Sequence, residues 1–116
     1  MAHFAKIESG LVTQVIVVSN NDCGGGDFPQ SEPIGQAFIA SLGLDGDWKQ
    51  TSYNETFRGR YAGIGITYSS QSDRFIDAKP FASWVLNTDY RWEAPISKPL
   101  LDGVWEWDEP NLQWVR

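Results

Sequence analysis

The stretch FAKIESGLVTQVIVV, residues 4–18, decides the fold. Two runs of strand-forming residues flank Ser9-Gly10, and this pattern predicts a β-hairpin that turns at these two residues. The second run ends in Val15–Val18, which is β-branched throughout. Such a run is typical of a strand at the centre of a sheet that is covered on both faces. With a two-residue turn, the pairs expected across the strands are Ile7 with Val12, Lys6 with Thr13 and Phe4 with Val15.

One helix is expected after this hairpin, over about residues 32–42. Ser31 can cap its start, and Gly43 can supply the left-handed residue that ends it. Ile34, Phe38 and Leu42 recur at helical spacing, so we expect this face to pack on the first sheet. The sequence therefore predicts an α+β fold, with an amino-terminal antiparallel hairpin and sheet packed by one helix in residues 1–65.

Towards the carboxyl terminus, the chain repeats a small pattern in which two aromatic residues flank a short polar turn. The three copies are Tyr68–Phe75, Trp84–Trp92 and Trp107–Trp114. In a hairpin with an even loop, directly opposed residues are separated by an odd number, so the first and third pairs can face each other. The second pair needs an odd loop, which usually carries a bulge. We expect residues 66–116 to form a meander of short β-hairpins, packed on the same domain as residues 1–65.

Trp105, Trp107 and Trp114 form the candidate contact surface. Trp105 and Trp107 share a strand face, and Trp114 is expected opposite Trp107, so the three rings would line one side of the final hairpin. An exposed aromatic surface of this kind binds a protein partner or stacks on sugar rings. The alternative is that the rings only pack within the fold, which is the commoner use of aromatics in small β domains.

Composition limits the partners of the chain. Its 116 residues carry a formal net charge of −6, and phosphate binding needs a basic face, so no nucleic acid is expected to bind. The longest apolar run, Val15–Val18, is far too short to span a bilayer, so no membrane partner is expected. Cys23 is the only cysteine, and the amino terminus has no secretory signal pattern. We expect a soluble protein that is made without export.

No motif predicts a catalytic centre. The only histidine, His3, lies beside the terminus, and a nucleophile pair with Cys23 would need two flexible segments to meet. The run Gly24–Gly26 lacks the lysine of a phosphate-binding loop and does not lead directly into a helix. Acidic pairs such as Asp45/Asp47 fall in predicted turns, where aspartate is expected for backbone reasons. The sequence predicts that the protein is not an enzyme and has no cofactor, catalytic residue or metal ligand.

Several segments together resemble a family of short, mostly uncharacterised proteins encoded by marine bacteriophages, cyanophages especially. These segments are Met1–Ile7, Val12–Val18, Asp22–Asp27, Trp48–Asn54, Phe57–Gly65, Pro80–Trp84 and Trp107–Glu109. The likeness covers nearly the whole chain, and it departs from the family pattern in the serine-rich turn after Tyr68. It implies a virion-associated or tail-associated structural role and carries over no catalytic residue.

The leading expectation is therefore a non-enzymatic phage structural or assembly protein that acts through protein–protein contacts. Its partners would be copies of itself, because hairpins with open edges favour pairing, or other virion proteins. It would be found in the host cytoplasm during assembly, with the virion as its further location. The alternative is a carbohydrate-binding module that recognises glycan through the tryptophans.

Overall fold

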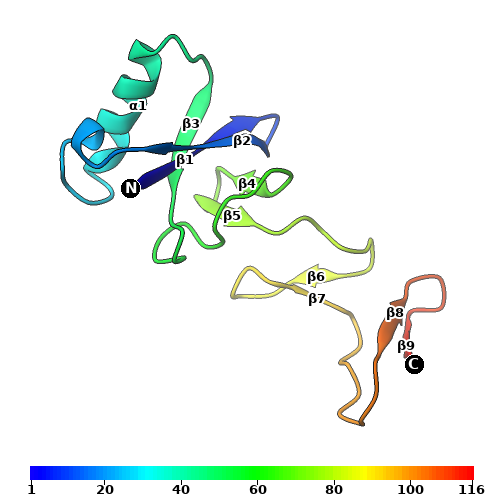
Figure 1. Ribbon diagram of the computed structural model, residues 1–116. Coiled ribbons are helices and arrows are strands. Elements are labelled where there is room, and N and C mark those ends of the chain that lie inside the picture. Colours follow the sequence, from blue (N-terminus) through cyan, green and yellow to red (C-terminus); the bar gives the residue numbers. More distant parts are fainter. The chain divides into compact units, whose positions relative to one another are not determined.

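Strands β1 (Ala2–Glu8) and β2 (Leu11–Val18) form the hairpin on which the first half of the chain is built (Figure 1). In the computed structural model, which describes residues 1–116, both turn residues Ser9 and Gly10 have positive φ, 52° and 79°. This is the backbone of a type I′ turn, whose twist matches that of the two strands. The predicted turn is confirmed.

A β-bulge changes the register that a plain hairpin would have. Ile7 faces Val12 as predicted, but Phe4 faces Ile16 instead of Val15, because the register shifts between Lys6 and Ile7. The extra residue brings Val12 and Val15 onto the same face of the sheet, where both contact one hydrophobic cluster. Lys6 likewise faces Gln14 instead of Thr13, so the pairings predicted for Phe4 and Lys6 are each wrong by one residue, and the bulge is the physical reason.

The fold is α+β, as predicted, with one helix and a five-stranded antiparallel sheet in the order β3-β1-β2-β4-β5. The bounds of the remaining elements of this part are η1 (Asn21–Cys23), α1 (Ser31–Ser41), β3 (Asp47–Thr51), β4 (Thr67–Ser69) and β5 (Arg74–Ile76). The helix α1 is the longest of the chain, and no helix is long and apolar enough to cross a membrane.

Alternating side chains divide the core between the two faces of the sheet. On one face, Phe4, Val18 and Trp48 are buried with Ile39 of α1. On the opposite face, residues of β1, β2 and β5 are buried with a residue of the glycine-rich segment after β3, and these are Ala5, Val12, Phe75 and Ala62. A strand with a core on each face is what the β-branched run of β2 predicts.

The helix α1 turns a different face to the sheet than its apolar spacing predicts. Of the predicted residues Ile34, Phe38 and Leu42, only Phe38 packs against the buried core, and Ile34 and Leu42 are 46% and 57% exposed. The buried residues of the helix are Ser31, Gly35 and Ile39. The physical reason is Gly35, since a Cβ there would lie 2.3 Å from Cζ of Phe4. The missing side chain lets the phenylalanine ring lie directly against the helix backbone, and this contact sets the rotation of the helix.

The two ends of α1 differ in how well they follow the prediction. The N-cap position is Gln30, without a capping side chain, because the Ser31 hydroxyl donates instead to Gln50 Oε1 at 2.7 Å. At the other end Gly43 has a φ of +80° and its N–H donates to Ala40 O, so it ends the helix as predicted.

The remaining strands form two separate hairpins. Strand β6 (Val85–Leu86) pairs with β7 (Trp92–Glu93), and β8 (Glu106–Asp108) pairs with β9 (Gln113–Val115). Tyr68 lies directly opposite Phe75, and Trp107 directly opposite Trp114, as the odd separations predict. Trp84 and Trp92 do not form the predicted pair. Asn87 Oδ1 accepts hydrogen bonds from two backbone N–H groups of the loop, which sets a register with Leu86 opposite Trp92.

The chain forms two compact units, Met1–Ile76 and Asp77–Arg116. The boundary expected from the sequence lies between residues 65 and 66 instead. The hairpin β4–β5 accounts for the difference, because Thr67 pairs with Leu11 of β2 and thus extends the first sheet.

Gly35→Ala tests the contact that sets the helix rotation. The added methyl group would collide with the buried Phe4 ring, so we expect a loss of unfolding free energy of about 1–3 kcal/mol, typical of overpacking. Gly63→Ala is the control, because a Cβ at Gly63 meets nothing within 4 Å and its φ is not positive. It should change stability by no more than about 0.5 kcal/mol. Equal urea midpoints for the two variants would contradict the role given to Gly35.

Candidate functional site

Three tryptophans meet in the second unit. The rings of Trp107 and Trp114 pack edge to face with centroids 5.3 Å apart, and Trp84 lies 6.2 Å from each of them. All three side chains are partly exposed. Their mutual angles of 60° to 82° are the geometry that aromatic quadrupoles favour over a face-to-face stack. We call these three residues the tryptophan cluster.

The tryptophan cluster differs from the candidate surface in one member. Trp107 and Trp114 belong to both, but Trp105 lies next to Arg116, whose guanidinium is 4.6 Å from the ring centroid. The Trp105 indole N–H donates to Leu101 O at 3.0 Å. Strand β8 begins only at Glu106, so strand alternation does not extend to Trp105. Sequence spacing did not reveal Trp84, because it reaches the cluster from another hairpin.

Glu109 is the polar anchor of the tryptophan cluster. Its carboxylate accepts hydrogen bonds from Ser83 Oγ at 2.6 Å, from Ser83 N at 3.0 Å and from Trp107 Nε1 at 2.8 Å. The bonds from the Ser83 hydroxyl and then the Trp107 indole hold the pKa of Glu109 below its usual value. One carboxylate thus ties the segment before β6 to the last hairpin, 26 residues away.

Most indole N–H groups of the second unit donate a hydrogen bond within that unit, and one does not. Trp114 Nε1 donates to Ile96 O at 2.8 Å, and Trp92 Nε1 donates to Asp77 O at 2.7 Å. Trp84 Nε1 is buried and has no hydrogen-bond partner. A buried donor without an acceptor costs about 1–3 kcal/mol, so Trp84 is held in place by its ring contacts at some expense in stability.

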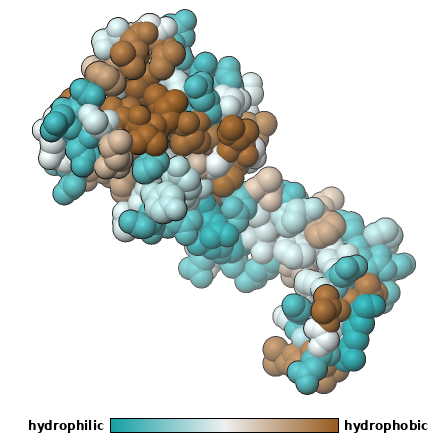
Figure 2. Space-filling view, viewed as in Figure 1, coloured by the Kyte–Doolittle hydropathy of each residue, from teal (hydrophilic) through white to brown (hydrophobic).

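Apolar exposure is the most unusual property of this unit. None of the residues 77–116 is buried, although five of the six tryptophans lie among them. Its exposed large apolar side chains are Phe81, Val85, Ile96, Leu100, Leu101, Val104 and Leu112. Figure 2 shows apolar side chains scattered among hydrophilic ones on this part of the surface.

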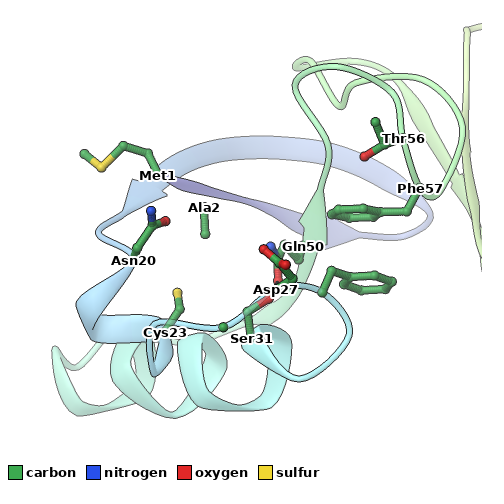
Figure 3. A pocket seen from close by; sticks show the side chains of 11 residues that line it. Met1, Ala2, Asn20, Cys23, Asp27, Ser31, Gln50, Thr56 and Phe57 are labelled. Carbon is green, nitrogen blue, oxygen red and sulfur yellow. Dashed lines mark hydrogen bonds between the residues drawn. The ribbon is translucent and has the colours of Figure 1, made fainter.

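The first unit has two adjoining hollows of about 400 and 450 Å³ at the start of β1. Figure 3 shows the first, whose lining includes Asp27, Ser31 of α1, Gln50 of β3 and Phe57. The Phe57 ring stacks on Phe28 at 4.0 Å. The Gln50 amide and the Asp27 carboxylate offer a hydrogen-bond donor and an acceptor to a small polar molecule.

The single histidine and cysteine line different hollows. His3 stands in β1, not in a frayed end, and its ring packs between Tyr53 and Tyr61 at 5.7 and 5.5 Å. Burial, and then the positive amino terminus, lower the pKa of His3. Cys23 is buried, and burial followed by the charge of Asp22 raises the pKa of its thiol. A raised pKa disfavours the thiolate, which is the nucleophilic form.

An ionic network joins α1 to the turn before β5 in the first unit. Arg58 forms an ion pair with Glu32 of α1 and donates through Nε to Asp73 at 2.9 Å. Tyr68 Oη donates to the same Asp73 oxygen at 2.5 Å. Burial disfavours the charged guanidinium, but the bond and charge of Glu32 outweigh it and raise the pKa of Arg58. Sequence reasoning missed this network, because its members are distant along the chain.

The pKa values of the Tyr68 phenol and the Asp73 carboxyl group both differ from their usual values. Burial and then the bond to Asp73 raise the pKa of Tyr68 to about 12. Burial alone would raise the pKa of Asp73, but the hydrogen bond from Tyr68 and the charge of Arg58 lower it overall. No group of three or more histidine, cysteine, aspartate or glutamate side chains is arranged to hold a metal ion.

No protein family model, curated protein or solved structure matches the chain.

Glu109→Ala tests the anchor of the tryptophan cluster. Losing the acceptor of Ser83 and Trp107 should detach the segment before β6, so tryptophan emission should shift to the red and acrylamide quenching should increase. The wild type should show the same change on strong acidification, because protonation of Glu109 removes the charged acceptor, and its lowered pKa moves this loss below the usual range of a glutamate.

Glu106→Ala is the matched control, since Glu106 is an exposed glutamate on the same hairpin. Its emission should equal that of the wild type at every pH. Identical spectra for the two variants would mean that Glu109 does not organise the cluster.

Asp73→Asn tests the ionic network through the pH dependence of stability. The folded pKa of Asp73 is below its unfolded value of about 3.9, so its contribution is present above that pH and is lost as the pH falls through the folded pKa. The variant should be less stable at neutral pH and lose less stability than the wild type on acidification. Urea unfolding at neutral pH and at about pH 3 measures this difference.

Asp45→Asn serves as the control, because Asp45 is exposed and forms no ion pair. Its acid destabilisation should match that of the wild type. If acidification lowers the stability of Asp73→Asn as much as that of Asp45→Asn, the charge of Asp73 contributes nothing to the free energy of unfolding.

Proposed function

We propose that the protein is a non-enzymatic structural or assembly protein of the bacteriophage type, which acts through protein–protein contacts made by residues 77–116. The observation that carries this proposal is the absence of any buried residue in that unit, despite its five tryptophans. Aromatic residues with partly exposed rings are the side chains that most often dominate protein interfaces.

The second unit is too small and too thinly packed to be stabilised by its own core. It has no disulfide, because Cys23 is the only cysteine and lies in the first unit. Its two ladders contain two and three residue pairs, and isolated hairpins of that size are marginal in water. Units of about 40 residues usually need a disulfide, a metal or a partner. A partner that covers the exposed apolar side chains would supply the missing burial.

The proposed partners are other virion proteins or further copies of the chain. The proposed setting is the host cytoplasm during assembly, and the virion afterwards. The resemblance to short cyanophage proteins supports this setting, and the apolar surface of the second unit supports the mode of action.

Glycan binding through the tryptophans is the alternative, and the geometry favours it less. Trp107 and Trp114 are inclined at 69° to each other, so the two rings present no common flat face to a sugar. Arg116 lies over the ring of Trp105.

The double variant Trp107→Ala/Trp114→Ala tests the proposal in particles of a phage that encodes the chain. Quantitative mass spectrometry of purified virions should find the wild-type protein in the particle. Truncating two interface tryptophans costs about 2 kcal/mol or more, so incorporation should fall by roughly 30-fold. Tyr53→Ala is the control, because it removes an exposed aromatic ring from the first unit and should leave incorporation unchanged.

Two results would overturn the proposal. One is a wild-type protein that is absent from the particle, and the other is a double variant that is incorporated as well as the wild type. Saturable binding on a glycan array that the double variant loses would favour the carbohydrate-binding alternative instead.

A further inference from the structure

The edges of the five-stranded sheet are protected unequally. Strand β3 forms one edge, yet three of its outward backbone groups already have side-chain partners. Trp48 O accepts from Gln36 Nε2 at 2.6 Å, Gln50 N donates to Glu32 at 2.8 Å, and Gln50 O accepts from Arg58 at 3.1 Å. Side chains thus take the places that a neighbouring strand would occupy, which prevents another strand from pairing there.

The opposite edge, β5, is also covered. Phe75 N donates to Arg58 O at 2.9 Å, and Phe75 O accepts from Arg60 N at 3.2 Å. The segment around Gly59 therefore runs beside β5 as a short parallel bridge. Neither end of the sheet order offers a free row of backbone groups.

The exception lies within the sheet, along β2. Strand β4 pairs with β2 only where Leu11 faces Thr67, and Val12 N–H and C=O bond to Ile66 and Gly65, so β2 from Thr13 onwards has a neighbouring strand on one side only. Val17, in this open part, is 52% exposed. The open edge, which we define as Thr13–Val18, is thus a stretch of β-branched and polar residues without a second partner strand.

Alternation along the ladders identifies the backbone groups at this open edge. Gln50 directs its N–H and C=O away from β1, so its neighbour Thr51 bonds to β1 at His3. Along β1 the groups that bond to β2 must then belong to Phe4, which pairs with Ile16. Val15 and Val17 therefore direct their N–H and C=O groups outwards from the sheet.

We propose that the open edge of β2 pairs with the same edge of a second copy, in antiparallel fashion about a twofold axis. Such a contact is self-complementary, because each outward N–H of one copy meets an outward C=O of the other. The choice of a second copy rests on charge. The chain carries a net charge of −6, but no residue from Leu11 to Ser19 is ionisable, so the pairing brings no like charges together. The result is a continuous sheet across two copies.

This inference does not depend on the proposed function. It concerns Met1–Ile76, whereas the proposed partner surface lies in Asp77–Arg116. Light scattering of the purified chain tests it without a virion partner, so either proposal can fail alone.

Val17→Pro is the decisive variant. Proline removes the outward N–H of Val17 and is tolerated at strand edges, so the fold should survive while pairing is lost. Size-exclusion chromatography with light scattering should show a concentration-dependent dimer for the wild type and a monomer for Val17→Pro. Val17→Thr is the control, because it keeps both the N–H and the β-branched side chain, and it should dimerise like the wild type.

Amide hydrogen exchange of the wild type tests the same pairing without a variant, so the result does not depend on whether Val17→Pro folds. Exchange at Val15 and Val17 should slow as the protein concentration rises, while exchange at Gln50, whose N–H already bonds to Glu32, should not change. A wild type that stays monomeric at high concentration, a folded Val17→Pro that still dimerises, or concentration-independent exchange at Val15 and Val17 would overturn the proposal.

Discussion

The ion pair between Arg58 and Glu32 is the interaction on which the first unit depends. Through these two side chains the helix α1, the edge of β3 and the turn at Asp73 are joined at one point. Both side chains are largely withdrawn from solvent, so either charge alone would be costly to bury. Arg58 also has a positive φ of 57°, a conformation that a non-glycine residue keeps only when its surroundings fix it.

The local features of the fold could be predicted from sequence, and the distant ones could not. The Ser9-Gly10 turn, the central strand and the glycine that ends α1 depend on neighbouring residues, and all three are confirmed. The opposed aromatic pairs also follow from counting residues around a loop. Glu32 and Arg58 are 26 residues apart and belong to no periodic pattern, so nothing in the sequence links them.

Packing explains the predictions that are wrong. Apolar spacing predicts which helix face is hydrophobic. It does not predict that Phe4 packs against the backbone at Gly35, where there is no side chain in the way. Likewise, Ser31 has the right residue type for a cap, but its hydroxyl is committed to the buried Gln50. Of the candidate contact residues, Trp107 and Trp114 could be identified because they oppose each other in one hairpin. Trp84 could not, because Glu109 joins its segment to that hairpin.

The two units differ in how much of their apolar surface and of their backbone is covered. The first unit has a buried apolar core on each face of the sheet, and Gln36, Glu32 and Arg58 block the edge of β3, so a strand edge without such cover stands out. The second unit has no buried residue, and the Glu109 carboxylate joins Trp107 to the segment that carries Trp84. A net charge of −6 opposes association between copies, and this repulsion is weakest at a surface without charges. The uncharged edge of β2 meets that condition, and its backbone groups add the directionality that apolar side chains lack.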